Sequence, residues 1–210
     1  MRYAKDHKAE TRARIVKSAA VQLREKGARG VGVADLMKEA GLTHGGFYAH
    51  FKSRDALVVE ALGQAMDGSR QRWRDVAEQA PEGERFAALV NQYVTAEHRD
   101  DPGRGCTMAA LGSEIVREGP KARKLFLAQL ERMIAALSAQ LPGSPEHARE
   151  QAIAALTNMV GSIVLSRVAG TGALSSDILD AGRSAALERG PKKPARKARA
   201  KVAAPKATNS

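Results

Sequence analysis

The sequence predicts an all-α protein, and three of its properties indicate this class. Apolar residues make up 43% of the 210 residues, but aromatic residues only 4%. Alanine, leucine and valine supply most of the apolar content, a mixture that favours packed helices over a sheet. Apolar positions also recur at three- and four-residue spacings along most of the chain, and no segment shows convincing strand alternation.

The first helix is expected over Lys8–Lys26, where apolar residues share one face. Gly27 is expected to end it. The apolar stripe consists of Ala9, Ala13, Val16, Ala20 and Leu23, widened by Ile15 and Ala19.

Two short helices are expected next. The first covers Val33–Ala40 and ends at Gly41, because glycine readily adopts the backbone conformations that a tight turn needs. The second covers His44–Phe51, with Thr43 as its N-cap.

The remaining elements are also expected to be helices. Ser53 is placed to cap a long fourth helix, which reaches about Gln79 before Pro81 ends the pattern. Apolar periodicity and turn residues predict a loop at 100–105 and further helices over Glu84–His98, Cys106–Val116, Lys121–Leu141, Glu146–Val168 and Ser175–Glu188.

The formal net charge of +11 is unevenly distributed along the chain. Residues 1–60 contain twelve basic and seven acidic residues, residues 61–190 are close to neutral, and residues 191–210 contain seven basic residues and no acid. Basic ends attract polyanions such as nucleic acid, although charge can also serve solubility alone. Residues 190–210 are expected to form a disordered basic tail that either contacts phosphates nonspecifically or is simply solvated.

The two short helices and their glycine turn form a candidate helix-turn-helix, spanning about residues 32–51. Val33, Leu36, Met37 and Ala40 give the first helix an apolar face, and Leu42 can be buried in the turn. Phe47 and Phe51 hold the second helix onto the others. A helix of this size fits the major groove, with its N-terminal residues nearest the base edges.

The residues left away from this core are Thr43, His44, Gly45, Gly46, Tyr48 and His50. The Gly45-Gly46 pair is a poor helix start. One reason for it is close approach of the backbone to DNA, and the alternative is that the pair only loosens the first turn.

Residues 41–57 read Gly-Leu-Thr-His-Gly-Gly-Phe-Tyr-Ala-His-Phe-Lys-Ser-Arg-Asp-Ala-Leu, and this stretch resembles the TetR/AcrR family of bacterial regulators. Asp35-Leu36 and Gly27 also fall where that family has them. The resemblance is specific from Lys8 to about Leu62. Two departures are Val31-Gly32, where the family usually has a Ser or Thr cap, and Arg54, where it often has Lys.

The resemblance implies a DNA-binding role for the matching residues. Tyr48 and Arg54 would bind phosphate, and His50 would contact the backbone or a base edge. Thr43, His44 and Gly45 would face bases or backbone. The full set of candidate DNA-binding residues is Thr43, His44, Gly45, Gly46, Tyr48, His50, Lys52 and Arg54.

The resemblance also implies a C-terminal domain whose last two long helices pair with a second subunit. The helix over Glu146–Val168 supports this, because its apolar surface is too wide for a lone exposed helix. The alternative is burial within one subunit. The candidate interface residues are Leu156, Met159, Val160, Ile163 and Val164, with Ile153 on the same surface.

The middle helices would then enclose a pocket for a small-molecule effector. The large flexible or aromatic residues available there are Met66, Trp73, Phe86, Tyr93, Cys106, Met108, Leu111, Phe126 and Met133, most of which are expected to be plain core. Cys106 follows Arg104-Gly105 and opens a helix, so the helix dipole and the arginine could lower the pKa of its thiol and make it a redox sensor. The alternative is a small buried apolar residue.

Several classes of function find no support in the sequence. No Gly-rich phosphate loop, nucleophile elbow or metal-spaced His/Cys cluster is present, so we expect neither an enzyme nor a cofactor or metal. A single cysteine excludes an intramolecular disulfide. The N-terminus lacks a signal peptide and no stretch suggests a membrane span, so we expect a cytoplasmic protein.

These observations support one interpretation of the domains and role of the chain. Residues 1–55 are expected to be a DNA-binding domain of three helices, and residues 56–189 a helical effector-binding and dimerisation domain. The chain would be a homodimeric repressor, released from a palindromic double-stranded DNA operator by an effector or by thiol modification. The alternatives are an activator on the same scaffold, a nucleoid-type architectural protein, and a helical small-molecule binding module with a vestigial DNA-binding head.

Overall fold

The computed structural model describes residues 2–30, 32–39, 41 and 43–191, and all elements in these ranges are helical. The α-helices are α1 Arg2–Gly30, α2 Val33–Glu39, α3 Arg54–Gln79, α4 Arg85–Tyr93, α5 Ala96–Asp100, α6 Thr107–Leu111, α7 Pro120–Ser138, α8 Pro145–Ala169 and α9 Ala173–Leu187. The 3₁₀ helices are η1 His44–Ala49, η2 Pro102–Arg104 and η3 Ile115–Arg117. The predicted all-α class, with a helix-turn-helix head and a helical body, is confirmed.

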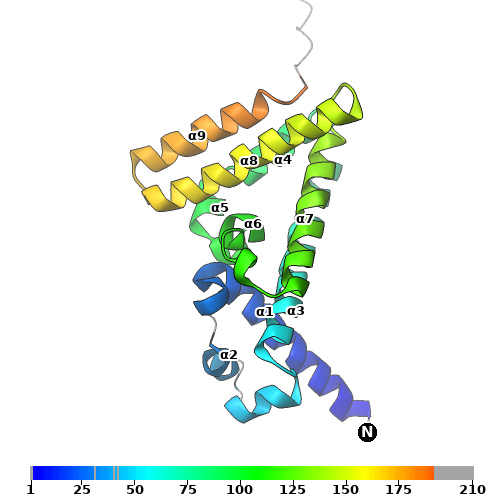
Figure 1. Ribbon diagram of the computed structural model, residues 1–210, viewed down its shortest axis with the longest axis vertical. Helices are drawn as coiled ribbons and strands as arrows, with labels where there is room; N and C mark the ends of the chain where they lie inside the picture. Colours follow the sequence, from blue (N-terminus) through cyan, green and yellow to red (C-terminus); the bar gives the residue numbers. More distant parts are fainter. Residues whose placement is uncertain (1, 31, 40, 42, 192–210) are drawn as a thin grey trace, which may run out of the picture.

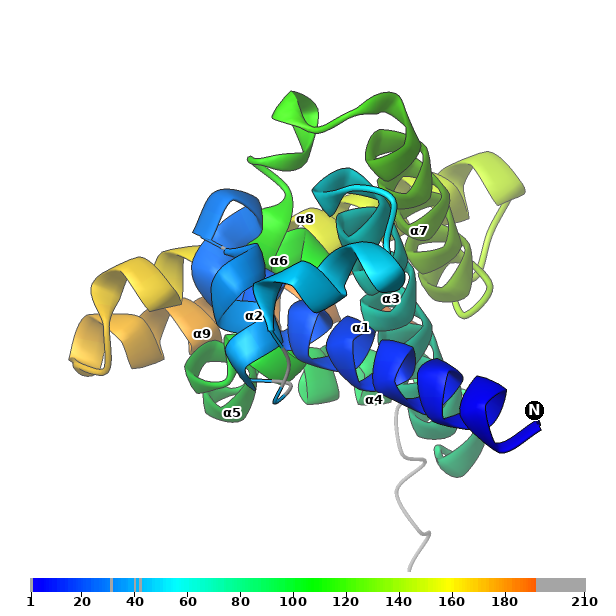
Figure 2. The same cartoon turned by 90° about the horizontal axis from the view of Figure 1, so that it is seen from below.

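The head lies at the lower end of the molecule in Figure 1 and consists of α1, α2, η1 and the start of α3. Its core contains most of the apolar faces that the periodicity predicted, but Ala9 and Ala13 of the predicted α1 stripe are exposed. The largest fully buried side chains of this core include Ile15, Leu23, Leu36, Met37, Phe47, Leu57 and Leu62. Helix α1 runs along α3, and α2 lies on η1, as the view from below shows (Figure 2).

The body lies above the head and is built on the antiparallel pair α8 and α9, with α7 standing against α8 (Figure 1). A second apolar core joins α4, α7, α8 and α9, with Phe86, Tyr93, Leu137, Met159 and Ile163 buried in it. Helix α3 connects the two parts. Its first half packs into the head core through residues such as Leu57 and Leu62, and its second half faces the body core through Trp73 and Val76.

Helix α1 departs from the predicted Lys8–Lys26 helix at both ends. It starts at Arg2, and the helical geometry breaks at Gly27, where φ is 79° and ψ is 168°, before one more short turn to Gly30. Gly27 therefore interrupts the helix as predicted. The Glu114 carboxylate stabilises this break by accepting a hydrogen bond from the Ala28 amide, with an N···O distance of 2.8 Å.

The predicted helix over Glu84–His98 is wrong, because the chain breaks between α4 and α5. The His98 ring binds the Tyr93 carbonyl, with an Nδ1···O distance of 2.7 Å, and so takes an acceptor that a continuous helix would use. The Thr95 side chain then caps α5 by accepting from the His98 amide at 3.1 Å.

The predicted helix over Cys106–Val116 is also wrong, because it is split into α6 and η3. Glu114 lies between the two pieces and reaches back to α1, which fixes the chain there. The predicted loop at 100–105 contains η2, which the Asp101 side chain caps by accepting a hydrogen bond from the Arg104 amide at 3.0 Å. Helices α7, α8 and α9 match their predicted ranges to within three residues.

Helix α8 is long and apolar enough to cross a membrane by length and composition alone, which the sequence analysis did not expect. A core helix of a globular protein meets the same criteria, and α8 packs closely on α7 and α9.

Some predictions fall on residues outside the described part of the chain. They concern Val31, Ala40 and Leu42, the His44 side chain, and the tail from residue 192 onward.

Candidate nucleic-acid interface and interior cavity

The turn between α2 and η1 adopts the predicted geometry at Gly41, whose φ of 72° lies in the left-handed region. The second short helix differs from prediction. It is a 3₁₀ helix over His44–Ala49, and not an α-helix to Phe51, with i+3 bonds such as His50 N to Phe47 O at 2.9 Å. Two glycines in six residues weaken an α-helix, so the tighter turn is a reasonable outcome. Thr43 occupies the N-cap position, but its side chain makes no capping bond, contrary to expectation.

Helix η1 has one buried and one exposed side. Phe47 and Phe51 are buried, and their rings stack with centroids 5.4 Å apart. The Tyr48 ring packs edge-on against Phe47, with centroids 5.3 Å apart, and the residue is 70% exposed. Thr43, Gly45 and Lys52 are exposed on the same region of the head. An exposed aromatic residue with a hydroxyl, fixed above a packed aromatic pair, is suited to a polar partner.

The two glycines of η1 differ in their surroundings. A side chain at Gly45 would meet open space, so this backbone can be approached closely from outside. A Cβ at Gly46 would lie 3.5 Å from the Met37 side chain, so Gly46 is in ordinary contact with α2. Gly45 therefore leaves room for a partner, whereas Gly46 belongs to the packing of the head.

His50 is less free than the sequence suggested. Its carbonyl accepts a hydrogen bond from Arg12 Nε at 3.3 Å, and its Nδ1 atom is buried with no hydrogen-bond partner among the described residues. Burial lowers the pKa of His50, and the nearby cations Lys8 and Arg12 lower it further. Arg12 also lies over the Phe51 ring, 4.6 Å from its centroid, and forms an ion pair with Glu60.

Arg54 is half-buried, and its guanidinium donates to the Ala28 carbonyl at the end of α1. Ser53 caps α3 as predicted, accepting from the Ala56 amide at 3.1 Å. Arg54 thus ties the end of α1 to the start of α3. A phosphate contact would have to use its remaining donors.

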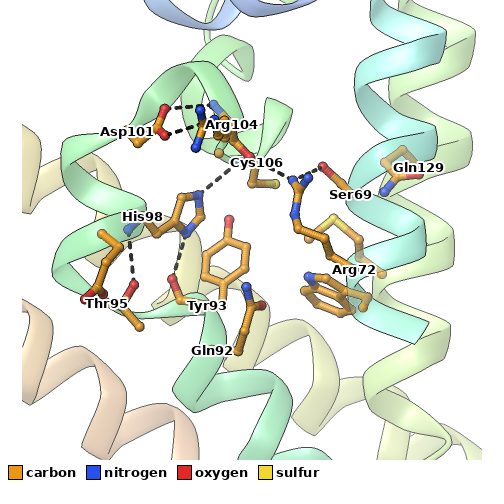
Figure 3. A pocket seen from close by; sticks show the side chains of 14 residues that line it. Ser69, Arg72, Gln92, Tyr93, Thr95, His98, Asp101, Arg104, Cys106 and Gln129 are labelled. Carbon is orange, nitrogen blue, oxygen red and sulfur yellow. Dashed lines mark hydrogen bonds and ion pairs between the residues drawn. The ribbon is translucent and has the colours of Figure 1, made fainter. Parts of the chain in front are cut away.

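The body contains a cavity of about 230 Å³ between α3, α4, the α5–α6 segment and α7, which opens to solvent beside the exposed residues Arg72, Gln92, Glu97 and Arg104 (Figure 3). Four of the predicted pocket residues line it, namely Trp73, Tyr93, Cys106 and Met133. The polar residues of its lining include Ser69, Arg72, Gln92, His98, Asp101 and Gln129.

The other predicted pocket residues lie elsewhere. Met108 and Phe126 line a separate apolar groove of about 760 Å³ between α6, α7 and α8. Met66, Phe86 and Leu111 are buried core residues, so their assignment to the pocket is wrong. Large apolar side chains at helical spacing belonged mainly to the cores, as such side chains usually do.

His98 organises one wall of the cavity. Its Nδ1 donates to the Tyr93 carbonyl, and its Nε2 accepts from the Cys106 amide at 2.9 Å. Both bonds require the neutral ring, because a second ring proton would face the Cys106 N–H. Burial lowers the pKa of His98 to about 4 from an ordinary 6.5, and the charges of Arg167 and Arg72 act in the same direction.

The Tyr93 hydroxyl points toward Cys106 in Figure 3. It is buried and makes no hydrogen bond of regular geometry with the described residues. Burial raises the pKa of Tyr93 well above its ordinary value, and the adjacent Cys106 thiol adds to this. The phenol therefore stays protonated and remains a donor.

Cys106 is the N-cap residue of α6, as expected, and its sulfur accepts from the Met108 amide at 3.4 Å. The thiol lines the cavity but is only 6% exposed. The predicted influence of Arg104 is wrong, because that side chain is 86% exposed and pairs with Asp101 at 3.6 Å. The environment of the thiol is set instead by Tyr93 and the cavity wall.

The wall of the cavity is hydrogen-bonded to the helices that support the head. Arg24 on α1 donates to the Gly103 carbonyl, with an Nε···O distance of 2.7 Å. Arg72 on α3 donates to the Arg104 carbonyl at 2.8 Å. A Cβ at Gly103 would lie 2.5 Å from the Glu25 side chain, so η2 rests directly on α1.

The predicted dimer-interface residues divide into two groups. Leu156, Met159 and Ile163 are buried in the body core, so the assignment of these three is wrong, and the alternative of burial within one subunit holds for them. Val160 is partly buried and Val164 is 39% exposed. Further large apolar residues of the body are exposed. Leu127, Leu130 and Ile153 line the groove between α6, α7 and α8 together with Val160, whereas Leu165, Val168 and Leu174 lie at the end of α8 and the start of α9.

The sequence reasoning missed the polar residues of the cavity. Arg72, Gln129 and Ser69 lie within amphipathic helices, where single polar residues carry no motif. The clearest available signal was Gln129, a polar residue on the otherwise apolar face of the helix over Lys121–Leu141, where it is buried in the structure.

Comparison with known proteins gives consistent results. Residues 15–61 match the family described as bacterial regulatory proteins, tetR family. An uncharacterized HTH-type transcriptional regulator of Mycobacterium tuberculosis is 30% identical over 172 residues, covering 75% of this chain and 84% of the relative. The regulator YerO of Bacillus subtilis is 30% identical over 95 residues, covering 43% of this chain and 31% of its own length.

Solved structures share the fold. A TetR transcriptional regulator from Chloroflexus aurantiacus has a TM-score of 0.75 at 20% identity, covering 87% of this chain and 95% of that one. The reduced form of Escherichia coli NemR has a TM-score of 0.71 at 20% identity, covering 85% of this chain and 96% of that one.

Proposed function

Because this chain belongs to the TetR family and is a DNA-binding transcriptional regulator and not an enzyme, we propose that it is a cytoplasmic, homodimeric repressor. In this proposal, a small-molecule effector in the interior cavity releases it from a palindromic operator. The observation that carries the proposal is the set of hydrogen bonds that connects the cavity wall to α1 and α3.

The DNA-binding surface is the exposed side of η1 with its flanking residues. Tyr48 and Lys52 supply a hydroxyl and a cation for phosphates, which position the protein on the duplex. Thr43 and the open backbone at Gly45 lie nearest the base edges. His44 is kept in this set on the basis of the sequence alone. His50 contributes through its ring and Arg54 through its remaining donors, since both backbone groups of His50 and one donor of Arg54 are engaged within the head.

The partner subunit docks on the exposed apolar side of α8. Ile153, Val164 and Val168 lie on one face of that helix, and Val168 is 82% exposed. Residues four or seven positions apart share a helix face, so these side chains form a stripe. A contiguous exposed apolar surface of this kind is typical of a protein interface. Two-fold symmetry then presents two heads to two half-sites, about one DNA turn or a multiple apart.

Effector release follows from the connections of the cavity wall. A ligand that displaces the segment from Asp101 to Cys106 pulls on the Arg24 and Arg72 contacts, and so on α1 and α3, which share the head core with η1. The ligand can shift the equilibrium only if it binds the released conformation more tightly than the DNA-bound one. Small displacements suffice, because both heads must meet successive major grooves together.

The experiment is selection of bound sequences from random DNA with the purified protein, followed by footprinting on the selected site. A regulator protects one discrete palindrome, and transcription from a promoter carrying that site falls when the protein is present. Coating of DNA without a discrete footprint indicates the architectural alternative. No specific binding indicates the binding-module alternative, and increased transcription indicates an activator.

Modification of Cys106 is the second proposed route of release. The thiol lies in the cavity wall at the start of α6, where added bulk would displace the same segment. Its low exposure means that a reagent must first enter the cavity. Operator binding of the unmodified and Cys106→Ser proteins is measured at increasing concentrations of hypochlorite or a quinone. Release of the unmodified protein alone is expected, and equal behaviour of the two proteins contradicts this route.

A further inference from the structure

We propose that the cavity binds a small organic acid, whose carboxylate contacts Arg72 and the Tyr93 hydroxyl and whose apolar part lies against Trp73. The inference rests on the proposed function, because it names the chemical class of effector for the same cavity. Its basis is the charge, the hydrogen-bonding capacity and the size of the lining.

Arg72 is a cation of the lining without an acidic partner among the described residues. Its guanidinium donates to Ser69 Oγ at 3.2 Å and to the Arg104 carbonyl at 2.8 Å, both of them neutral acceptors. The other lining arginine, Arg104, is paired with Asp101. Glu97 also belongs to the lining and, like Arg72, is exposed to solvent, but the two side chains form no ion pair. Arg72 is therefore available to an anion.

The free polar groups of the cavity are mainly hydrogen-bond donors. The buried Tyr93 hydroxyl has no regular partner, and its raised pKa keeps it protonated. The amide oxygen of the buried Gln129 accepts from Arg132 Nε at 3.3 Å, which leaves the NH₂ group as its free end. Both ring nitrogens of His98 are already used. An acceptor-rich ligand satisfies these donors, and a carboxylate offers two oxygens that accept only.

The rest of the lining restricts the size and shape of the acid. At about 230 Å³ the cavity is below the roughly 300–1,000 Å³ of pockets for drug-sized ligands. Trp73 and Met133 give it an apolar side, and the Trp73 ring stands perpendicular to Tyr93 with centroids 6.1 Å apart. A single ring or a short chain attached to the carboxylate fits this space.

Three probes of nearly the same shape separate charge from size. Benzoate is an anion, benzamide is neutral and benzamidine is a cation. Trp73 is the only tryptophan of the chain and lines the cavity, so its fluorescence reports binding directly on the full-length protein. We expect benzoate to produce a saturable change in the Trp73 fluorescence. Benzamide should bind at least tenfold more weakly, and benzamidine should not reach saturation.

Two variants test the contacts, and a third is the control. Arg72→Gln and Tyr93→Phe are each expected to weaken benzoate binding about tenfold, the usual effect of losing a hydrogen bond to a charged group. Arg74→Gln removes an arginine from the same helix, where its guanidinium binds Gln71 at 2.6 Å and does not line this cavity. The control variant is expected to bind benzoate as the unmodified protein does.

Tyr93→Phe removes only a hydroxyl without a regular partner, so this variant keeps the fold even if Arg72→Gln loosens the cavity wall. The proposal is overturned if benzamide or benzamidine binds as tightly as benzoate. It is equally overturned if no probe changes the fluorescence through the millimolar range, or if both variants bind benzoate normally. Operator binding without any probe is measured on the same preparation, so failure of the repressor proposal is distinguished from failure of this one.

Discussion

At the scale of single residues, Tyr48 is the side chain whose exposure is easiest to connect with function. We expect Tyr48→Phe to weaken operator binding about tenfold, because a hydroxyl bonded to a charged phosphate is lost. The loss should be similar for related DNA sequences, since phosphate contacts carry little sequence information. Fluorescence anisotropy with labelled operator measures the effect.

The melting temperature of Tyr48→Phe serves as the control. It should not change, because the side chain is 70% exposed and the hydroxyl is not needed for the packing of Phe47 and Phe51. Unchanged operator affinity would remove Tyr48 from the DNA-binding surface.

His98 makes the stability of the body depend on pH. Its pKa falls from 6.5 in the unfolded chain to about 4 in the folded protein, so the unfolded chain binds the additional proton between these values. The stabilising contribution is complete above about pH 6.5 and is lost as the pH falls toward 4. At 1.36 kcal/mol per pKa unit, the loss reaches about 3 kcal/mol.

Denaturant unfolding at a series of pH values measures this loss, and NMR of the histidine rings measures the pKa itself. A His98 ring that titrates near 6.5 would show that its two hydrogen bonds do not hold it neutral.

At the scale of secondary-structure elements, the break in α1 at Gly27 gives a test with an internal control. Gly27→Ala places a Cβ at a φ of 79° and 2.7 Å from the Glu114 carboxylate, so we expect a loss of at least about 1 kcal/mol of stability. Gly63 lies inside α3 with open space around it. Gly63→Ala should therefore stabilise by roughly 0.5–1 kcal/mol.

Thermal or denaturant unfolding compares the two variants with the unmodified protein. The two variants are expected to change the free energy of unfolding in opposite directions. A neutral or stabilising Gly27→Ala would mean that α1 does not need its break, and that the Glu114 contact is unimportant.

The elements also show how far the sequence was informative. Long helices such as α7 and α8 were predicted well, because many apolar residues repeat the same period and cap residues mark the ends. The breaks inside 84–98 and 106–116 were missed, because the groups that cause them come from elsewhere in the chain or from a side-chain ring. Glu114 acts on Ala28, 86 residues away, and His98 takes the Tyr93 carbonyl. Periodicity contains no information about such contacts.

The candidate site was predictable to different degrees in its two parts. The head carries a continuous motif from Gly41 to Leu57, so its exposed residues could be named individually. The cavity is assembled from α3, α4, α5, η2 and α7, and each of them contributes one or two polar residues that look ordinary in the sequence. Arg72 and Gln129 became candidates only when packing placed them around one space.

At the scale of the whole molecule, a glutamate is expected to affect assembly on one side of α8 and folding on the other. Val164→Glu places a charge on the exposed stripe and should give a folded monomer with much weaker operator binding. Ile163→Glu places the charge in the body core, where an unpaired carboxylate is very costly, and should prevent folding.

Light scattering and circular dichroism distinguish the two results. A folded dimer of Val164→Glu would exclude this part of α8 from the interface. A monomer of the unmodified protein at micromolar concentration would contradict the dimer altogether.

The contacts between the cavity wall and the supporting helices end on backbone carbonyls, those of Gly103 and Arg104, and not on side chains. Substitution at position 104 therefore leaves the acceptor in place, and its side chain already points into solvent. Position 103 must remain glycine, because η2 rests on Glu25 there. Residues that line the cavity without taking part in these bonds, such as Met133 and Gln92, can also be replaced without loss of the two acceptors. Ligand preference is thus free to diverge among descendants of this protein while the transmission of the signal is inherited unchanged.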